Sequence, residues 1–134
     1  MFSLKAEDLS FQWNENCRQA YRNILLYDTA EAKRLIELEK GNALSVYLES
    51  YLDVIYLIAF EDESKWDYFE KRFENRMDKL SDAEEESEFY HFTQAECELH
   101  RSLALMKFGK FLPAGWHFNK AFKQYKKQDE QHPD

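Results

Sequence analysis

The stretch ALSVYLESYLDVIYLIAF, residues 43–60, is the most apolar part of this 134-residue sequence. Its apolar residues recur at the spacing that places side chains on one face of an α-helix, with further residues that widen this face to a second one. The first face holds Tyr47, Leu48, Tyr51, Leu52, Ile55 and Ile58, and the second adds Val46, Val54 and Leu57. A helix that is apolar on two faces packs between neighbours. We therefore expect a helix over 43–60, with Leu48, Leu52 and Ile55 at the centre of the core.

This apolar stretch does not predict a membrane span. Glu49 and Asp53 interrupt it, and it is shorter than the roughly 20 residues that a helix needs to cross a bilayer. The beginning of the sequence, MFSLKAEDLS, has neither the basic flank nor the apolar run of a secretory signal. We expect a soluble protein, cytoplasmic by default, and exported or membrane-associated if a leader was removed. The compartment itself stays open.

Two helices are expected before this stretch. Apolar residues at helical spacing predict the first over about 13–26, and a stripe that includes Leu35 and Ile36 predicts the second over about 29–40. Asp28 and Glu31 have the spacing of a capping box, so Asp28 marks the start of the second helix. The buried face of the first helix is expected to contain Trp13, Cys17, Ala20, Tyr21 and Ile24.

Three helices are expected after it. A narrow stripe from Trp66 to Leu80 predicts the first, and the acidic run 82–88 is expected to be a loop or a frayed helix start. The next helix extends to about 108, with Thr93 as a possible start, and Gly109 ends it in a left-handed conformation. Pro113 then lies in the first turn of the last helix. The buried stripe of that helix is expected to be Ala114, Phe118, Ala121, Phe122 and Tyr125.

Short connections between six helices predict three antiparallel hairpins, at approximately 13–40, 43–80 and 88–130, within one domain over residues 1–134. An internal repeat supports this arrangement. Displacement of the first hairpin by 82 positions aligns small residues with small ones and large residues with large ones, without a gap between the two helices. Examples are Ala20 with Ser102 and Ala32 with Ala114.

The last hairpin resembles the tetratricopeptide repeat (TPR). Gly109-Lys110-Phe111, followed by Ala114, Phe118 and Ala121, is similar to the second half of such a repeat, over about 30 residues. The resemblance implies a TPR-like α-solenoid of three stacked hairpins. Glu98 and Arg101 depart from the pattern, because a TPR carries an aromatic residue and a leucine there, and Lys126 replaces its closing proline.

Two longer phrases carry a second resemblance. FQWNENCRQAY (11–21) and KFGKFLPAGWHFNKAFK (107–123) resemble the N-terminal helical part of larger, uncharacterised bacterial TPR-like proteins, which are often exported or membrane-associated. This resemblance implies that the chain is a fragment or a short relative, and that its last helix normally stacks against a further repeat.

Charge and chemistry argue against several classes of function. The net charge is −8, which would repel the phosphates of a nucleic acid. His91, Glu96 and His100 lack the spacing of a metal site. Cys17 and Cys97 fit small buried side chains better than a disulfide, although their pairing stays open. There is no phosphate loop and no GxSxG motif. We therefore expect no cofactor, no metal and no catalysis.

The function expected from these observations is a non-catalytic scaffold that binds a protein or peptide. The TPR resemblance nominates positions on the first helix of each hairpin, and an apolar patch is expected at the end of the stack. The candidate partner-binding residues are Tyr21, Leu25, Leu103, Lys107, Trp116, Phe122 and Tyr125. Tyr56, Tyr68 and Tyr90 fall off the clearest stripes and are further possible anchors. The alternatives are a homo-oligomerisation module, such as a homodimer, and a small helical enzyme whose site is not visible in sequence.

Overall fold

The computed structural model describes residues 9–60 and 63–133. Within these residues the chain forms six α-helices, a 3₁₀ turn (Glu63–Lys65) and no strand, which confirms the all-α class. The helices are α1 (Glu15–Leu25), α2 (Thr29–Glu37), α3 (Leu44–Phe60), α4 (Trp66–Ser81), α5 (Tyr90–Lys107) and α6 (Phe111–Gln131).

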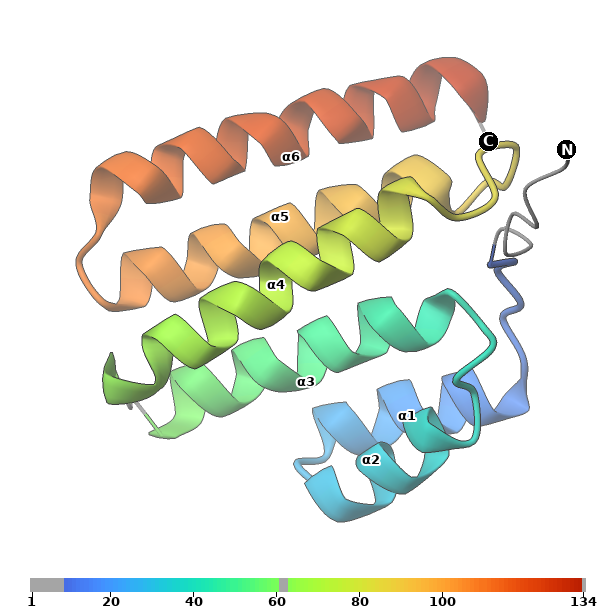
Figure 1. Ribbon diagram of the computed structural model, residues 1–134, viewed down its shortest axis with the longest axis horizontal. Coiled ribbons are helices and arrows are strands. Elements are labelled where there is room, and N and C mark those ends of the chain that lie inside the picture. Colours follow the sequence, from blue (N-terminus) through green and yellow to red (C-terminus); the bar gives the residue numbers. More distant parts are fainter. Residues whose placement is uncertain (1–8, 61–62, 134) are drawn as a thin grey trace, which may run out of the picture.

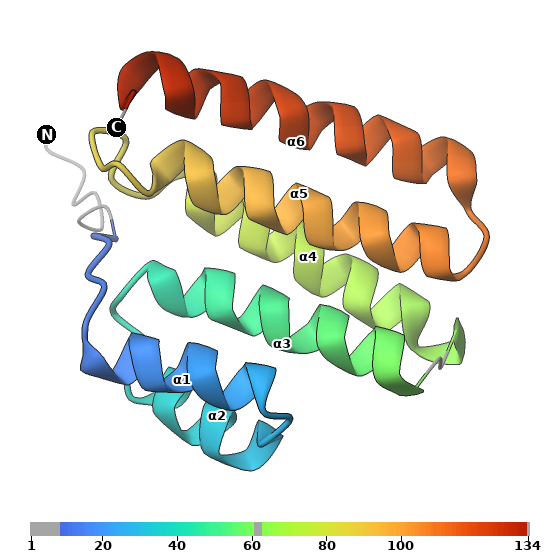
Figure 2. The same cartoon turned by 180° about the vertical axis from the view of Figure 1, so that it is seen from behind.

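Consecutive helices run antiparallel and form three hairpins, α1–α2, α3–α4 and α5–α6, which are stacked side by side (Figure 1). Helices α1, α3 and α5 form one layer at the front of Figure 2, with α2 and α4 behind it. Helix α3 packs against α1, α2, α4 and α5, whereas α6 packs on α5 at the end of the stack. The neighbours of α3 confirm the prediction that residues 43–60 are sandwiched.

The core lies along α3 and the helices beside it. Leu48 and Leu57 of α3 are fully buried, and so are Phe73 and Leu80 of α4. Leu52 is buried as predicted, whereas Ile55 is only partly buried. Ile58, in the last turn of α3, is exposed. The stripe predicted for α3 is therefore buried over its first three turns and opens to solvent at its end.

Specific polar contacts begin two of the helices. Asn14 caps α1 by accepting a hydrogen bond from the backbone N–H of Cys17 at 3.0 Å. Asp28 caps α2 in the same way, with the N–H of Glu31 at 3.2 Å from Oδ1, as the capping-box spacing predicts. The Glu31 side chain does not complete the box, because it pairs with Arg34.

Helices α1 and α5 end in the same motif. After α5, Gly109 has a φ of 75°, and its N–H and that of Lys110 donate to carbonyls of the last turn, which is a Schellman motif. The predicted left-handed conformation of Gly109 is confirmed. After α1, Tyr27 takes the same place with a φ of 60°. Tyr27 and Gly109 are 82 positions apart, so the internal repeat extends to the backbone geometry of the hairpin turns.

Two expected boundaries are wrong. Helix α5 begins at Tyr90, not at Thr93. Thr93 is buried one turn inside, where its hydroxyl donates to the carbonyl of Phe89 at 2.9 Å instead of capping the helix. Trp13 was expected in the buried stripe of the first helix, but it precedes Asn14 and is exposed. The capping interaction of Asn14 sets the start of α1 and excludes Trp13 from it.

The buried stripe expected for the last helix is also wrong in part. Ala114 and Ala121 are buried, but Phe118 and Phe122 are exposed, and His117 is buried in their place. The reason is the direction from which α5 approaches. Residues three and four apart share a helix face, and α5 covers the face of 114, 117 and 121.

Candidate functional site

The exposed side of α6 carries the largest group of solvent-accessible apolar side chains on one helix within the part of the chain that the structure describes. We call it the α6 surface. The exposed fraction of its residues ranges from 56% for Phe118 to 90% for Leu112. Its members are Phe111, Leu112, Trp116, Phe118 and Phe122. Among the helices of residues 9–60 and 63–133, α6 packs on α5 at the end of the stack, and none of them covers these side chains (Figure 1).

The α6 surface has two sides. Phe111, Phe118 and Phe122 lie at helical spacing and share one side of the helix. Trp116 lies about 120° around the helix from Phe122, on the other side. There the ammonium group of Lys120 lies 3.9 Å from the centroid of the Trp116 ring, a cation–π contact. Trp116 and Phe122, which were nominated together, are therefore both exposed but do not form a single stripe.

The other nominated residues are divided between the two ends of the stack. Tyr21 and Leu25 belong to α1, at the opposite end from α6 (Figure 1). Leu25 is half exposed, whereas Tyr21 is partly buried, with its ring 5.4 Å from that of Tyr51. Leu103 and Lys107 lie one turn apart on the exposed side of α5, in the same hairpin as the α6 surface.

Tyr125 connects α6 to the interior. Its hydroxyl donates to the carboxylate of Glu96 on α5, and the hydroxyl of Tyr47 on α3 lies 3.5 Å from the other oxygen of that carboxylate. Burial raises the pKa of both tyrosines, and the charge of Glu96 raises it further. Both hydroxyls therefore stay protonated and act as donors. Tyr125 is a structural link between helices as well as a neighbour of the α6 surface.

An aromatic row crosses the layer of α1, α3 and α5. Successive ring centroids lie 5.4 Å apart from Tyr21 to Tyr51, 6.3 Å from Tyr51 to Tyr47, and 6.1 Å from Tyr47 to Phe92. His100 stacks on Tyr47 from α5, at a centroid distance of 6.0 Å. Such contacts between flat rings favour a fixed geometry. The row couples the three hairpins into one unit.

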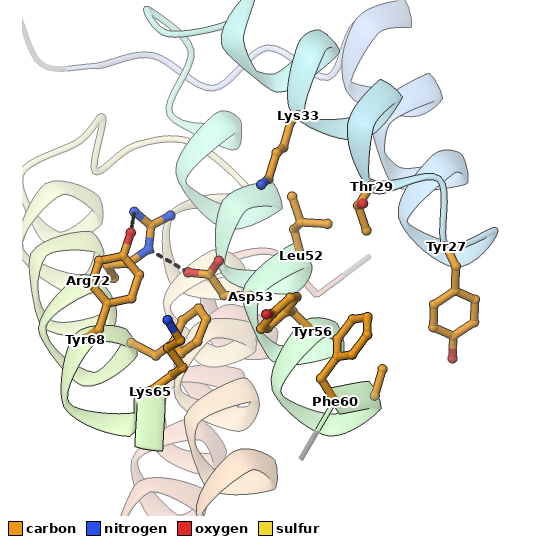
Figure 3. Close-up of a pocket in the computed structure, with 12 residues that line it drawn as sticks. Tyr27, Thr29, Lys33, Leu52, Asp53, Tyr56, Phe60, Lys65, Tyr68 and Arg72 are labelled. Atoms are coloured by element: carbon orange, nitrogen blue, oxygen red, sulfur yellow. Dashed lines mark hydrogen bonds and ion pairs between the residues drawn. The ribbon is translucent and has the colours of Figure 1, made fainter. Parts of the chain in front are cut away.

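A cavity of about 720 Å³ lies between α2, α3 and α4, on the side of the stack away from α1 and α5 (Figure 3). Aromatic rings and charged groups line it together. The residues are Tyr27, Thr29, Lys33, Leu52, Asp53, Tyr56, Ala59, Phe60, Lys65, Tyr68, Phe69 and Arg72. Sequence analysis singled out Tyr56 and Tyr68 as possible anchors but did not identify the cavity. Its walls come from three helices, and no linear spacing relates α2 to α4.

The acid in this cavity is already neutralised. Asp53 accepts a hydrogen bond from Nε of Arg72 at 2.9 Å and a second one from the buried Arg76. Arg72 also lies over the ring of Tyr68, 5.4 Å from its centroid. These contacts hold the guanidinium and the phenol ring in place. Asp53 and Arg72 thus form an ion-paired wall of the cavity, with the buried Arg76 behind it.

The nucleophilic and metal-binding groups of the chain do not form a catalytic arrangement in the residues that the structure describes. Cys17 and Cys97 are buried free thiols, as predicted for small core side chains. Burial raises the pKa of the Cys97 thiol to about 12 and that of Cys17 above its usual value, so both stay protonated. Over 9–60 and 63–133, no three His, Cys, Asp or Glu side chains are grouped to hold a metal ion.

Comparison of the chain with protein-family models, with curated proteins and with solved structures gives no match. The helices within the described ranges are also too short or too polar to cross a membrane.

Proposed function

We propose that this chain is a non-catalytic scaffold, made of TPR-like hairpins, that binds a protein or peptide. Small residues support the TPR-like reading. Ala20 and Ala32 are fully buried between α1 and α2, and their counterparts in the last hairpin, Ser102 and Ala114, are buried as well. Side chains of this size let two helices approach closely, as in helical repeats.

The α6 surface is the observation that carries the proposal. Stacked helical repeats normally end in a helix with a polar outer face, because the end of the stack meets water. Helix α6 instead exposes all five side chains of the α6 surface to more than half of their area. A contiguous exposed apolar surface marks an interaction site. The partner that fits is an amphipathic helix, which would pack on α6 as a further repeat does.

The layer of α1, α3 and α5 is a second candidate surface of the same scaffold. In TPR-like stacks the first helix of each hairpin faces the bound segment, which nominates Tyr21 and Leu25 on α1 and Leu103 and Lys107 on α5. The exposure of Leu25 and Leu103 supports this assignment. The α6 surface ranks first because its apolar residues are larger and more exposed.

Selection from a random peptide library tests the proposal, with the full chain as bait. Selected sequences should carry apolar residues at helical spacing, and their affinity should fall at least about tenfold for Phe118→Ser/Phe122→Ser. Leu26→Ser/Leu38→Ser is the matched control, because it removes two exposed apolar side chains from the opposite end of the stack. Equal loss in both double variants, or no helical pattern in the selected peptides, would contradict a specific site on α6.

Self-association is the second candidate function, and the same surface favours it. Two copies that pack through α6 would each cover the phenylalanines of the other, as in a symmetric dimer. Light scattering over a concentration series separates the two candidates. A dimer that becomes a monomer on Phe118→Ser/Phe122→Ser supports self-association, whereas a monomer at all concentrations leaves the α6 surface to a different partner.

The enzyme alternative has less support. The two thiols are protonated and buried, and His100 lies in the interior with its Nδ1 at 2.9 Å from the hydroxyl of Ser50. A general base must reach its substrate, and the buried ring of His100 does not reach the surface. A non-catalytic role is therefore the one that we propose.

A further inference from the structure

We infer that the cavity between α2, α3 and α4 binds a small aromatic acid, a planar ring that carries a carboxylate. This inference is independent of the proposed function, because it concerns a different surface and a different class of ligand. The cavity volume of about 720 Å³ falls in the range of small-molecule sites, roughly 300 to 1,000 Å³. Its size, charge and rings each restrict what it can hold.

The charge of the cavity favours an anion. Its lining contains three cations, Lys33, Lys65 and Arg72, and one carboxylate, Asp53. Asp53 is already engaged by Arg72 and by Arg76 behind the wall. Lys33 and Lys65 have no acidic partner within 4.0 Å among the residues that the structure describes, and both are exposed. The lining residues thus carry a net positive charge, in a chain whose net charge is −8.

The positions of the two lysines suit a carboxylate at the cavity. Figure 3 shows Lys33 reaching from α2 toward α3, and Lys65 on the α4 side near Tyr68. A carboxylate in the cavity that reaches either ammonium group would accept charge-assisted hydrogen bonds, which are stronger than those between neutral groups. The ion pair of Asp53 with Arg72 keeps that acid from competing for the lysines.

The rings of the cavity favour a planar apolar group. Tyr56 and Phe60 pack on each other, with centroids 4.7 Å apart, and Tyr68 lies across from them. The exposed fraction is 38% for Tyr56 and 59% for Tyr68, so each ring offers a free face. Aromatic rings prefer to stack with another ring at an offset or edge to face. A flat ligand between the two tyrosines would cover area that water now contacts.

Tyr27 gives an independent indication. It occupies the left-handed position at the end of α1, with a φ of 60°, where Gly109 stands in the equivalent turn after α5. Glycine adopts this conformation without strain, but a tyrosine does not. The Tyr27 side chain is 67% exposed, so packing does not explain its presence. Its ring lines the cavity, and strain retained at such a position points to a function of that ring.

The test begins with a matched pair of probes. Calorimetric titration of the full chain with 2-naphthoate should give saturable binding with one site per chain. 2-Naphthamide has the same ring without the charge, and we expect it to bind at least about tenfold more weakly. Absence of saturable binding of 2-naphthoate at millimolar concentration would overturn the inference, and so would equal affinity for the two probes.

Two double variants separate the cavity from the general charge of the chain. Lys33→Gln/Lys65→Gln removes two of the three cations of the lining, and we expect affinity for 2-naphthoate to fall at least about tenfold. Lys71→Gln/Lys79→Gln removes the same charge from exposed positions of α4 that do not line the cavity. The control should bind like the parent. An equal loss in both variants would show that long-range attraction, rather than contact in the cavity, holds the anion.

Tyr27→Gly tests the aromatic half of the inference. The substitution relieves the left-handed strain, so the melting temperature should rise while the affinity for 2-naphthoate falls. Tyr68→Ala, at a ring that is more than half exposed, should weaken binding with little change in melting. If both variants bind like the parent, the rings do not contact the ligand and the inference fails.

Localisation of the probe keeps this inference distinct from the proposed function. Phe118→Ser/Phe122→Ser should bind 2-naphthoate with the affinity of the parent, because the α6 surface lies at the end of the stack and does not line the cavity. Loss of binding in that variant would place the probe on α6 and overturn the inference. Nuclear Overhauser contacts from the naphthalene protons to the Tyr56 and Tyr68 rings are the positive result expected for the parent.

Discussion

Glu98 of α5 and His117 of α6 face each other inside the last hairpin, with Oε2 of Glu98 at 2.6 Å from Nδ1 of His117. Each residue is only 5% exposed. Glu98 stands where the TPR pattern has an aromatic residue. Arg101, the second residue that differs from the TPR pattern, is also buried. Its Nε lies 4.0 Å from a carboxylate oxygen of Glu70, and its guanidinium group lies over the ring of Phe73. Glu98 is thus hydrogen-bonded to a partner on α6, whereas Arg101 has a longer ion pair and a ring contact, and its Nη2 has no hydrogen-bond partner among the residues that the structure describes.

The first prediction concerns this pair. His117→Leu leaves the carboxylate of Glu98 buried without its partner, and we expect a loss of roughly 3 to 5 kcal/mol in the free energy of unfolding. Glu98→Leu/His117→Leu should recover much of that loss, because neither polar group then remains. Urea denaturation of the parent, the two single variants and the double variant measures the coupling. Strictly additive losses would show that the pair does not act as a unit.

Substitution of two glycines by alanine is expected to change the stability of the fold in opposite directions. A Cβ at Gly109 or at Gly115 would meet no atom within 4 Å, so space does not distinguish them. Gly109 has a φ of 75°, and Gly109→Ala should therefore cost about 1 to 2 kcal/mol. Gly115 lies within α6 at an exposed position, and Gly115→Ala should stabilise by up to about 1 kcal/mol. Thermal denaturation that shifts both variants in the same direction would refute the backbone argument.

The pH dependence of stability should report His100. Burial, with a smaller contribution from the charge of Arg76, lowers the pKa of this imidazole to about 3 from its usual 6.5. The unfolded chain binds the proton below about pH 6.5, but the folded chain does not until about pH 3. His100 therefore does not lower the free energy of unfolding above pH 6.5. As the pH falls from 6.5 to 3, the free energy of unfolding decreases by roughly 1 kcal/mol per pH unit because of this residue.

His100→Gln isolates this effect. Glutamine retains a hydrogen-bonding group opposite the Ser50 hydroxyl but does not titrate. Denaturation of parent and variant between pH 7 and pH 4 should show a shallower decline for the variant, since the carboxylates are common to both. Parallel declines over this window would mean that His100 takes up its proton equally in the folded and the unfolded chain.

Hydrogen bonds of Asn42 connect the segment before α1 to the start of α3. Its Nδ2 donates to the carbonyl of Gln12 at 2.6 Å, and its Oδ1 accepts from the N–H groups of Gln12 and Leu44, each at 3.0 Å. Asn42→Leu removes all three bonds, and we expect a cost of about 2 to 3 kcal/mol. Asn42→Asp keeps the acceptor but turns a carboxylate oxygen toward the carbonyl of Gln12 and the carboxylate of Glu39, so it should cost at least as much. Exposed Asn119→Leu is the control, expected within about 0.5 kcal/mol of the parent by urea denaturation.

Several features of the fold follow from local sequence alone. The spacing of Leu48, Leu52 and Leu57 identifies a helix that is apolar on two faces, and only a sandwiched position can bury both. Gly109 and Asp28 mark a helix end and a helix start, because backbone dihedral angles and capping bonds depend on residues within one or two turns. These predictions agree with the structure for that reason.

The surfaces of the molecule were harder to predict. Phe118 and Phe122 have the spacing of a buried stripe, but the direction of α5 leaves them exposed and buries His117. Trp116, which was expected to bind a partner, lies off that stripe and is exposed. The sequence of a single helix shows which residues share a face. It does not show which face a neighbouring helix covers when several faces are apolar.

The cavity also shows which features the sequence determines and which only the tertiary structure determines. Helical periodicity determined where α2, α3 and α4 lie in the sequence, because hydrogen bonding and side-chain spacing along one helix are local properties. Only the tertiary structure places Lys33 and Lys65 in the lining of one cavity and brings Asp53 into ion pairs with Arg72 and Arg76. Those contacts join residues from different helices, and their geometry depends on how the hairpins pack. Packing is a sum of many weak contacts over the whole chain, so no single segment of the sequence contains it.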